Sequence, residues 1–596
     1  MNPSSLPHWD LTTIFPSLDA PEFEAALAAV SADITALVAL CDAEGIMLRD
    51  TPPALDTALV TTLETVLERI NAVSVQAHVV AAYLQNSIAV DSRNAAAQTR
   101  MSTLQLELVR LRQLNTRLVA WLGGLDVEWL IAQSPVAAAH AYALRKASTE
   151  AQHLMSPAEE ALAADLNLTG GSAWAKLYNN YSSQIQTQVE IEGVSQTLPM
   201  TALRNLAYHA DRDLRRRAYE AELTAWEAHA LPLAAAMNSI KGQMNALTAR
   251  RGWTPLDVAL FNNNIDYETL EAMLDTAREY FPVFRRYLRA KARALDVEQL
   301  AWYDLFAPLP VGSRVWDFEL ARDFILEQFG AFSPRMEGLA ARAFAERWID
   351  AEPRDGKRGG AFCAWARKDE SRILANFTPA YGGVNTLAHE LGHAYHNLAR
   401  SGCTYIQRDT PMTLAETASN FCELLVRQAA LERAEPAEQL AILESSLQHA
   451  TQTVVDITSR FIFEREVFAQ RQQRELSTEE LNMLMRDAQL ETYGDGLDAD
   501  YLHPYMWAVK PHYYTVTFYN FPYMFGTLFS LGLFARYRQT PEAFLADYDA
   551  LLVATGMDDA ATLAARFDMD IRSPAFWRGS LNVLAEEVAR FEGLIG

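Results

Sequence analysis

Apolar residues recur at three- and four-residue spacing through most of the chain, which is the period of amphipathic helices. Residues 21–122 are rich in Ala and Leu at this spacing, residues 125–168 continue it, and the pattern returns from Thr201 onward. Such a pattern predicts a mainly α protein, with long antiparallel helices in its first part. We find no internal repeat and no low-complexity tract.

Two stretches break the helical period. In residues 185–199 apolar and polar residues alternate on both sides of a Glu192-Gly193 turn, which predicts a short β-hairpin. In residues 355–384 glycines bracket apolar runs of strand length, which predicts a small antiparallel sheet. An exposed edge of that sheet could pair with an extended peptide backbone, and a buried structural hairpin is the alternative.

The length and net charge of the chain limit its domain organisation and the classes of partner that it could bind. At 596 residues the chain is too long for one simple core. We expect an N-terminal helical lobe, residues 1–199, that ends in the β-hairpin, and a helical domain, residues 200–596, that carries the chemistry. The formal net charge of −24 argues against a nucleic-acid partner or an anionic membrane surface, because both require a basic face.

The sequence suggests no membrane partner. Residues 1–16 lack a basic segment followed by an apolar run, and we expect no membrane-spanning helix. The cysteines are dispersed without Cys-x-x-Cys spacing, so neither a disulfide framework nor a cysteine zinc site is predicted. Reduced thiols are typical of a cytoplasmic protein, which is the location we expect.

A single H-E-x-x-H pattern, His389 to His393, carries the strongest chemical signal in the sequence. We predict that it lies on one helix over residues 386–400, bounded by Gly382-Gly383. The two histidines then lie one turn apart, offset by about 40° around the axis, so both imidazoles can reach one metal ion. Glu390 lies on the flank, where its carboxylate can act as general base on a metal-bound water.

A third metal ligand is expected on the next helix, predicted over residues 413–425. Glu416 stands twenty-three positions beyond His393, and a His, His, Glu set with one open position is typical of catalytic zinc. Thr413 and Glu416 also fit a capping box, in which the carboxylate would only satisfy a backbone N–H. Glu423, two turns further on, would either accept a hydrogen bond from a ligand histidine or be an exposed helix carboxylate.

These motifs together resemble the thimet oligopeptidase family of metallopeptidases, M3, and within it the oligoendopeptidase F branch. The resemblance rests on Gly356 to Cys363, Ile373 to Phe377, Thr386 to His396, Glu416 to Ser419, Pro511 to Tyr514, Phe518-Tyr519, Tyr523, Gly526, and the opening Trp9-Asp10-Leu11 and Phe15-Pro16. It implies an elongated multi-helix molecule with a deep central channel that admits unfolded oligopeptides. It also implies that His512, Tyr523 and Tyr519 form a catalytic wall that donates hydrogen bonds to the anionic intermediate.

We therefore predict a zinc-dependent endopeptidase that acts on short oligopeptides. His389, His393 and Glu416 would bind one Zn²⁺ per chain, and Glu390 would take the proton of the attacking water and deliver it to the leaving amine. Two alternatives are a helical zinc carboxypeptidase, which trims only C-terminal residues, and a non-catalytic peptide-binding scaffold with a structural metal. The same ligands would accept cobalt or manganese.

Overall fold

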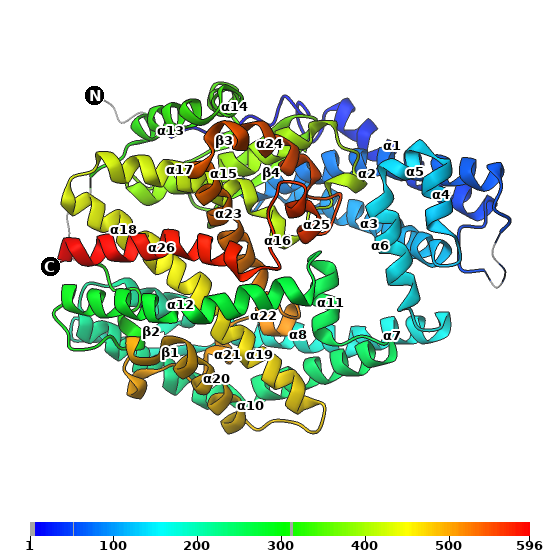
Figure 1. The fold of residues 1–596 in the computed structure, drawn as a ribbon. Helices are drawn as coiled ribbons and strands as arrows, with labels where there is room; N and C mark the ends of the chain where they lie inside the picture. Colours follow the sequence, from blue (N-terminus) through cyan, green and yellow to red (C-terminus); the bar gives the residue numbers. More distant parts are fainter. Residues whose placement is uncertain (1–5, 50, 52, 310–313, 596) are drawn as a thin grey trace. The chain divides into compact units, whose positions relative to one another are not determined.

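The computed structural model describes residues 6–49, 51, 53–309 and 314–595, and it is mainly helical with two small sheets (Figure 1). The chain forms two compact units, each assembled from three separate stretches of sequence. Unit 1 contains residues 1–154, 314–429 and 536–567, and unit 2 contains residues 155–313, 430–535 and 568–596. The expected domain boundary at residue 199 stays a prediction.

Unit 1 carries the first helices of the chain and the predicted metal-binding motif. Its helices are α1 (Pro21–Ala43), α2 (Thr57–Val90), α3 (Ala95–Leu122), α4 (Val127–Gln133), α5 (Pro135–Ala139), α6 (Ala141–Gln152), α13 (Phe318–Phe332), α14 (Pro334–Ala345), α15 (Tyr381–Ala399), α16 (Met412–Ala415), α17 (Thr417–Arg433, in unit 1 up to residue 429), α24 (Pro541–Ala554) and α25 (Ala560–Ala565). Helices α1, α2 and α3 pack against one another, as the helical period of residues 21–122 predicts.

Helix α1 is long and apolar enough to span a membrane, although no membrane-spanning helix was expected from the sequence. Its most apolar 18-residue window has a mean hydropathy of 1.7, so by length and composition alone the helix could span a membrane, as a core helix of a soluble protein also could. Its buried residues Val30, Ile34, Leu37 and Cys41 recur at three- and four-residue spacing and join the core formed with α2 and α3. This one-sided burial is that of a packed amphipathic helix.

The sheet of unit 1 has three strands in the order β3-β5-β4. β4 (Phe362–Arg367) pairs antiparallel with β5 (Glu370–Leu374), as predicted, whereas β3 (Ile349–Asp350) pairs in parallel with β5. The sheet is therefore mixed and not purely antiparallel as predicted. Strand β3 was not predicted because it is too short to show a strand pattern in the sequence. Helix α15 packs against both β4 and β5, so the sheet does lie beside the helix that carries the histidines.

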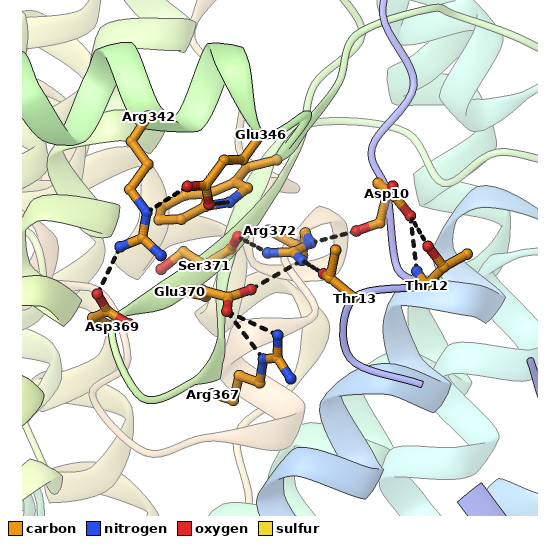
Figure 2. A network of polar contacts seen from close by, with 11 residues as sticks. Asp10, Thr12, Thr13, Arg342, Glu346, Arg367, Asp369, Glu370, Ser371 and Arg372 are labelled. Atoms are coloured by element: carbon orange, nitrogen blue, oxygen red, sulfur yellow. Dashed lines mark hydrogen bonds and ion pairs between the residues drawn. The ribbon is translucent and has the colours of Figure 1, made fainter. Parts of the chain in front are cut away.

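A polar network joins the start of the chain to this sheet (Figure 2). Arg372 on β5 is buried, and its Nε donates to the carbonyl oxygen of Asp10 at 2.9 Å while its Nη2 donates to Thr13 Oγ1 at 2.7 Å. Glu370 forms an ion pair with the same guanidinium at 3.2 Å and accepts a hydrogen bond from Arg367. The network thus holds residues 10–13 against β5.

Unit 2 contains the remaining helices and the β-hairpin. Its elements are α7 (Pro157–Thr169), α8 (Gly171–Ser182), β1 (Gln186–Ile191), β2 (Val194–Pro199), α9 (Met200–Asn205), α10 (Arg212–Arg250), α11 (Pro255–Asn262), α12 (Tyr267–Ala294), α18 (Pro436–Thr451), α19 (Ile457–Arg471), α20 (Thr478–Tyr493), α21 (Met506–Val509), α22 (His512–Thr515), α23 (Phe521–Gln539, in unit 2 up to residue 535) and α26 (Pro574–Ile595). A π-helical turn over Gln452–Asp456 links α18 to α19.

The hairpin predicted in residues 185–199 is confirmed. β1 and β2 pair antiparallel from Gln186 opposite Pro199 to Ile191 opposite Val194. Glu192 and Gly193 both have positive φ, 51° and 78°, which is the backbone that a two-residue hairpin turn requires.

Candidate metal centre

Helix α15 begins earlier than the sequence predicts, at Tyr381. Gly382 and Gly383 form its first turn, although the pair was expected to lie before the helix, as a break at its start. A Cβ on Gly383 would lie 2.2 Å from the carbonyl oxygen of Thr378, so this glycine serves a close packing contact. A packing role of this kind leaves no signal that distinguishes it from a helix break in the sequence.

The predicted metal ligands converge at one point of unit 1. His389 and His393 lie one turn apart on α15, with ring centroids 4.8 Å apart at an interplanar angle of 86°. The Nε2 atoms of both histidines lie 3.3 Å from the same oxygen, Oε2 of Glu416. Over the described part of the chain, these three residues form the one group of three or more His, Cys, Asp or Glu that could hold a metal ion, and their ligand atoms all lie within 4.8 Å of one another.

Glu416 lies between two helices and not inside the single helix that was predicted over residues 413–425. Its backbone has φ −91° and ψ 6°, where α16 ends and α17 begins. Helix α16 has Pro411 as its N-cap, so the spacing from Thr413 to Glu416 is not a capping box at a helix start. The hydroxyl of Ser419 donates to Glu416 Oε2 at 2.7 Å, a contact that the sequence analysis did not identify.

A close approach of two helices brings the ligands together. A Cβ on Gly392 would lie 2.6 Å from the carbonyl oxygen of Ala418 and 2.6 Å from Cα of Ser419. Glycine at this position therefore lets α15 contact the backbone at the start of α17. The junction that carries Glu416 is held next to His393 as a result.

Glu423 on α17 contacts a ligand histidine, which decides between the two readings of this residue. Its Oε1 accepts a hydrogen bond from Nδ1 of His389 at 2.5 Å, and its Oε2 accepts one from Asn385 Nδ2 at 2.7 Å. A proton on Nδ1 leaves Nε2 as the atom available to a metal. Asn385 was not identified from the sequence, although it lies one helical turn before His389 on the same face.

The centre is electrostatically suited to a cation. Burial alone would lower the pKa of His389, but the hydrogen bond and charge of Glu423, with Glu390 and Glu416, raise it to about 9. Burial alone would raise the pKa of Glu416, but His393 and His389 lower it to about 2. The carboxylates therefore stabilise positive charge at this point.

The distances from Glu416 Oε2 to the two histidines match those around a metal ion of the size of zinc. Bonds of about 2.0–2.1 Å in a tetrahedron place ligand atoms about 3.3 Å apart. This is the distance from Glu416 Oε2 to Nε2 of each histidine. Two imidazoles and one carboxylate are also a donor set that leaves a fourth position open.

In the part of the chain that the structure describes, Glu390 has the burial and the unpaired carboxylate oxygen that a general base requires. It is buried in α15, with 4% of its surface exposed, and its Oε2 has no hydrogen-bond partner among the described residues. Burial raises its pKa, although the two neighbouring histidines oppose the shift. A buried carboxylate oxygen without a partner is costly unless it has a function or a bound molecule to contact.

Strand β4 lies at an edge of the sheet, beside α15. The carbonyl oxygen of Trp365 accepts a hydrogen bond from His78 Nε2 at 2.9 Å, so the backbone of Trp365 faces away from β5. Because strand residues alternate, the backbone N–H and C=O of Cys363 face the same way. Burial and the nearby charge of Glu390 raise the pKa of the Cys363 thiol.

The three aromatic candidates cluster together in unit 2. His512 in α22 stacks on Tyr519 with ring centroids 4.4 Å apart at 23°, and the hydroxyls of Tyr519 and Tyr523 lie 2.6 Å apart. Burial, with the charges of Arg460 and Lys510, lowers the pKa of His512 to about 4. The imidazole is therefore neutral near pH 7, and its catalytic role, like that of both tyrosines, stays a prediction.

Known proteins match the chain over most of its length. The family model "Peptidase family M3" matches residues 336–583, and the model "Oligopeptidase F" matches residues 125–186. The group B oligopeptidase PepB of Streptococcus agalactiae is 25% identical over 449 residues, which cover 74% of this chain and 74% of that protein. Oligopeptidase PepF of Bacillus subtilis is 24% identical over 464 residues, 76% of this chain and 69% of that protein.

Solved structures share the fold. The crystal structure of a candidate peptidase from Chlamydophila abortus has a TM-score of 0.82 at 21% identity and covers 98% of both chains. That of oligoendopeptidase-F from Enterococcus faecium has a TM-score of 0.70 at 18% identity, covering 96% of this chain and 99% of that one. With the family matches, the chain belongs to peptidase family M3, in its oligoendopeptidase F branch, and is a metalloendopeptidase.

Proposed function

We propose that this protein is a zinc-dependent endopeptidase that hydrolyses internal bonds of short, unfolded oligopeptides. The observation that carries the proposal is the convergence of His389 and His393 on one oxygen of Glu416, with the buried Glu390 between them in sequence. The relatives in Streptococcus agalactiae and Bacillus subtilis are named oligopeptidases, which supports peptides as the substrate class.

His389, His393 and Glu416 would hold the zinc ion. When bound, zinc supplies a Lewis acid that lowers the pKa of a water and polarises the scissile carbonyl. Glu423 keeps the Nδ1 proton of His389 in place, so that Nε2 points its lone pair at the metal position. Ser419 fixes the carboxylate of Glu416 through its 2.7 Å hydrogen bond.

Glu390 would act as the proton carrier of the reaction. Its unpartnered Oε2 is free to accept a proton from the attacking water and to deliver it to the leaving amine. We assign His512, Tyr523 and Tyr519 as hydrogen-bond donors to the oxyanion that forms on the substrate carbonyl. The lowered pKa of His512 supports a neutral donor role for its imidazole.

The edge strand β4 would bind the peptide backbone. The outward-facing N–H and C=O of Cys363 can pair with an extended substrate, as in other cases of strand addition. Such pairing reads the backbone and few side chains, which suits an enzyme that accepts many peptides. We also propose a cytoplasmic location, which the four free cysteines support, and a catalytic domain spanning residues 200–596.

Glu390→Gln tests the proposal. This variant keeps the size of the side chain but removes the base, so hydrolysis of a quenched peptide with blocked ends should fall by about 10²–10⁴-fold while zinc stays bound. Glu444→Gln, at a buried carboxylate of α18, is the control and should keep full activity. Undiminished hydrolysis by the zinc-loaded Glu390→Gln variant would remove Glu390 from this role.

Product masses separate the proposal from its alternatives. An endopeptidase cuts a peptide with blocked ends at internal bonds, whereas a carboxypeptidase leaves it whole and removes single residues from a free C-terminus. A peptide that binds to the zinc-loaded protein and is never cut would instead indicate a binding scaffold.

A further inference from the structure

Two side chains of α19 hold the loop that carries Tyr519. We call residues 516–520, between α22 and α23, the tyrosine loop. Glu464 contacts Phe518, the residue before Tyr519, and Arg460 contacts Asn520, the residue after it. Because Arg460 and Glu464 are four residues apart on one helix, they project from the same face, one turn apart.

Glu464 is buried and contacts two partners through one of its carboxylate oxygens. Its Oε1 accepts the backbone N–H of Phe518 at 3.1 Å and the ammonium of Lys241 at 2.6 Å. The side chains of Lys241 and Glu464 are only 1% and 2% exposed. A carboxylate in this setting forms charge-assisted bonds that are stronger and more directional than neutral ones.

Phe518 needs such support because its backbone is in the left-handed region. Its φ is 50°, a conformation that is unfavourable for a residue with a Cβ. Its ring is buried against Phe461 and Phe468 of α19, with centroid distances of 5.3 and 5.4 Å. The hydrogen bond to Glu464 and this ring packing together fix the direction in which the chain leaves Phe518.

The second contact fixes the other side of Tyr519. Nη1 of Arg460 donates to Asn520 Oδ1 at 3.2 Å, and the same guanidinium is paired with Asp456. Asp456 ends the π-helical turn that precedes α19. Single π-helical turns inside helices occur frequently at functional sites. Here the last residue of the turn, Asp456, pairs with Arg460, which contacts the tyrosine loop.

Tyr519 in turn determines the geometry of the other two aromatic candidates. Its ring stacks on His512 and its hydroxyl lies 2.6 Å from that of Tyr523. A shift of the tyrosine loop would therefore move a hydrogen bond and a ring contact at once. We propose that Glu464, paired with Lys241, is a positioning residue that sets His512, Tyr519 and Tyr523 for catalysis, an inference that rests on the proposed function.

The test compares two buried lysine–glutamate pairs of unit 2. Lys291 and Glu444 also lie 2.6 Å apart, with side chains 0% and 10% exposed, but they join α12 to α18 and the structure gives them no contact with the tyrosine loop. Glu464→Gln, Glu464→Ala and the control Glu444→Gln are assayed for peptide hydrolysis and for thermal unfolding, each as the zinc-loaded full chain.

We expect kcat to fall about tenfold in Glu464→Gln and about a hundredfold in Glu464→Ala, with KM within about threefold of the wild type, since oxyanion donors act on the transition state. Glu444→Gln should lose comparable thermal stability but keep its kcat. Lys241→Met combined with Glu464→Gln, which removes the unpaired ammonium and keeps an acceptor for Phe518, should recover most of the kcat. An unchanged kcat in Glu464→Ala, or an equal loss in Glu444→Gln, would overturn the proposal.

Hydrogen exchange gives a readout that does not depend on activity. The amide of Phe518 should exchange at least tenfold faster in Glu464→Ala than in the wild type or in Glu444→Gln, because its acceptor is gone. Unchanged exchange would overturn the positioning role even if kcat fell. If the wild type cut no peptide, the proposed function would fail and the catalytic claim with it, whereas the exchange result would still report whether Glu464 holds the loop.

Discussion

Replacing Glu423 by Gln tests how the metal centre is oriented. The two carboxylate oxygens of Glu423 have different partners, His389 Nδ1 at 2.5 Å and Asn385 Nδ2 at 2.7 Å. A glutamine has only one oxygen, so its NH₂ group must face one of these two donors. If the amide oxygen stays on His389, the contact to Asn385 becomes donor against donor, and the bond to His389 loses its charge assistance.

The expected loss of zinc affinity follows from these contacts. Loss of an outer carboxylate partner of a ligand histidine costs about 10–100-fold in metal affinity, or about 1.4–2.8 kcal/mol. Glu423→Gln should lie at the lower end of this range because it can still accept from Nδ1, and Glu423→Ala at the upper end. Asn385→Ala, which leaves the bond between Glu423 and His389 in place, should cost less than either.

Zinc affinity is measured by competition with a chelator, starting from metal-free protein whose fold is checked by circular dichroism. Glu432→Gln, at an exposed carboxylate of the same helix, controls for the loss of one negative charge and should change affinity by less than about twofold. Binding by Glu423→Gln as tight as by the wild type would show that the 2.5 Å contact does not orient His389.

Two further predictions concern packing and charge. Gly392→Ala should destabilise the protein by about 1–3 kcal/mol and weaken zinc binding, because its Cβ would lie 2.6 Å from the carbonyl oxygen of Ala418. Gly382→Ala, in the same helix with open space around it, should instead stabilise by about 0.5–1 kcal/mol in thermal unfolding, and a similar loss in both variants would refute the packing argument. Burial, with Arg460 nearby, lowers the pKa of Lys510 to about 7, whereas an unfolded lysine titrates near about 10.4. The unfolded chain therefore binds more protons between these values, so the cost of burying Lys510 is full below pH 7 and fades as the pH rises. Lys510→Met should be more stable than the wild type at about pH 6, with the difference in unfolding free energy shrinking towards about pH 10, and a difference that grows with pH would contradict the burial of a charged lysine.

Local chemistry of the site could be predicted from the sequence. The four-residue spacing of His389 and His393 fixes their common helix face, and the confirmed turn at Glu192-Gly193 follows from residue type alone. Glu416 lies with the two histidines in one cluster, but its position between two helices differs from the single helix predicted over residues 413–425. The sequence around it reads as continuous helix, and only the contact of α15 with α17 explains the interruption.

Pairing between residues far apart in the chain could not be predicted from the sequence. Strand β3 has two residues and acquires its identity only by pairing with β5, so no local pattern could reveal the mixed sheet. The compact units interleave stretches separated by more than a hundred residues, and contacts of that range leave no periodic signal. Gly383 shows the same limit, because a glycine that packs against a carbonyl oxygen inside a helix looks identical in sequence to one that precedes a helix.

The bonds from Arg372 to Asp10 and Thr13 join residues 362 and 359 positions apart, so the opening segment emerges from the ribosome long before its partner exists. Helices α1 to α3 need only neighbours in sequence and can assemble early, whereas closing so long a loop is slow. Residues 10–13 must therefore stay undocked on the nascent chain until β5 has been translated. A chain whose synthesis stops before Arg372 would therefore leave residues 10–13 undocked and accessible to proteases.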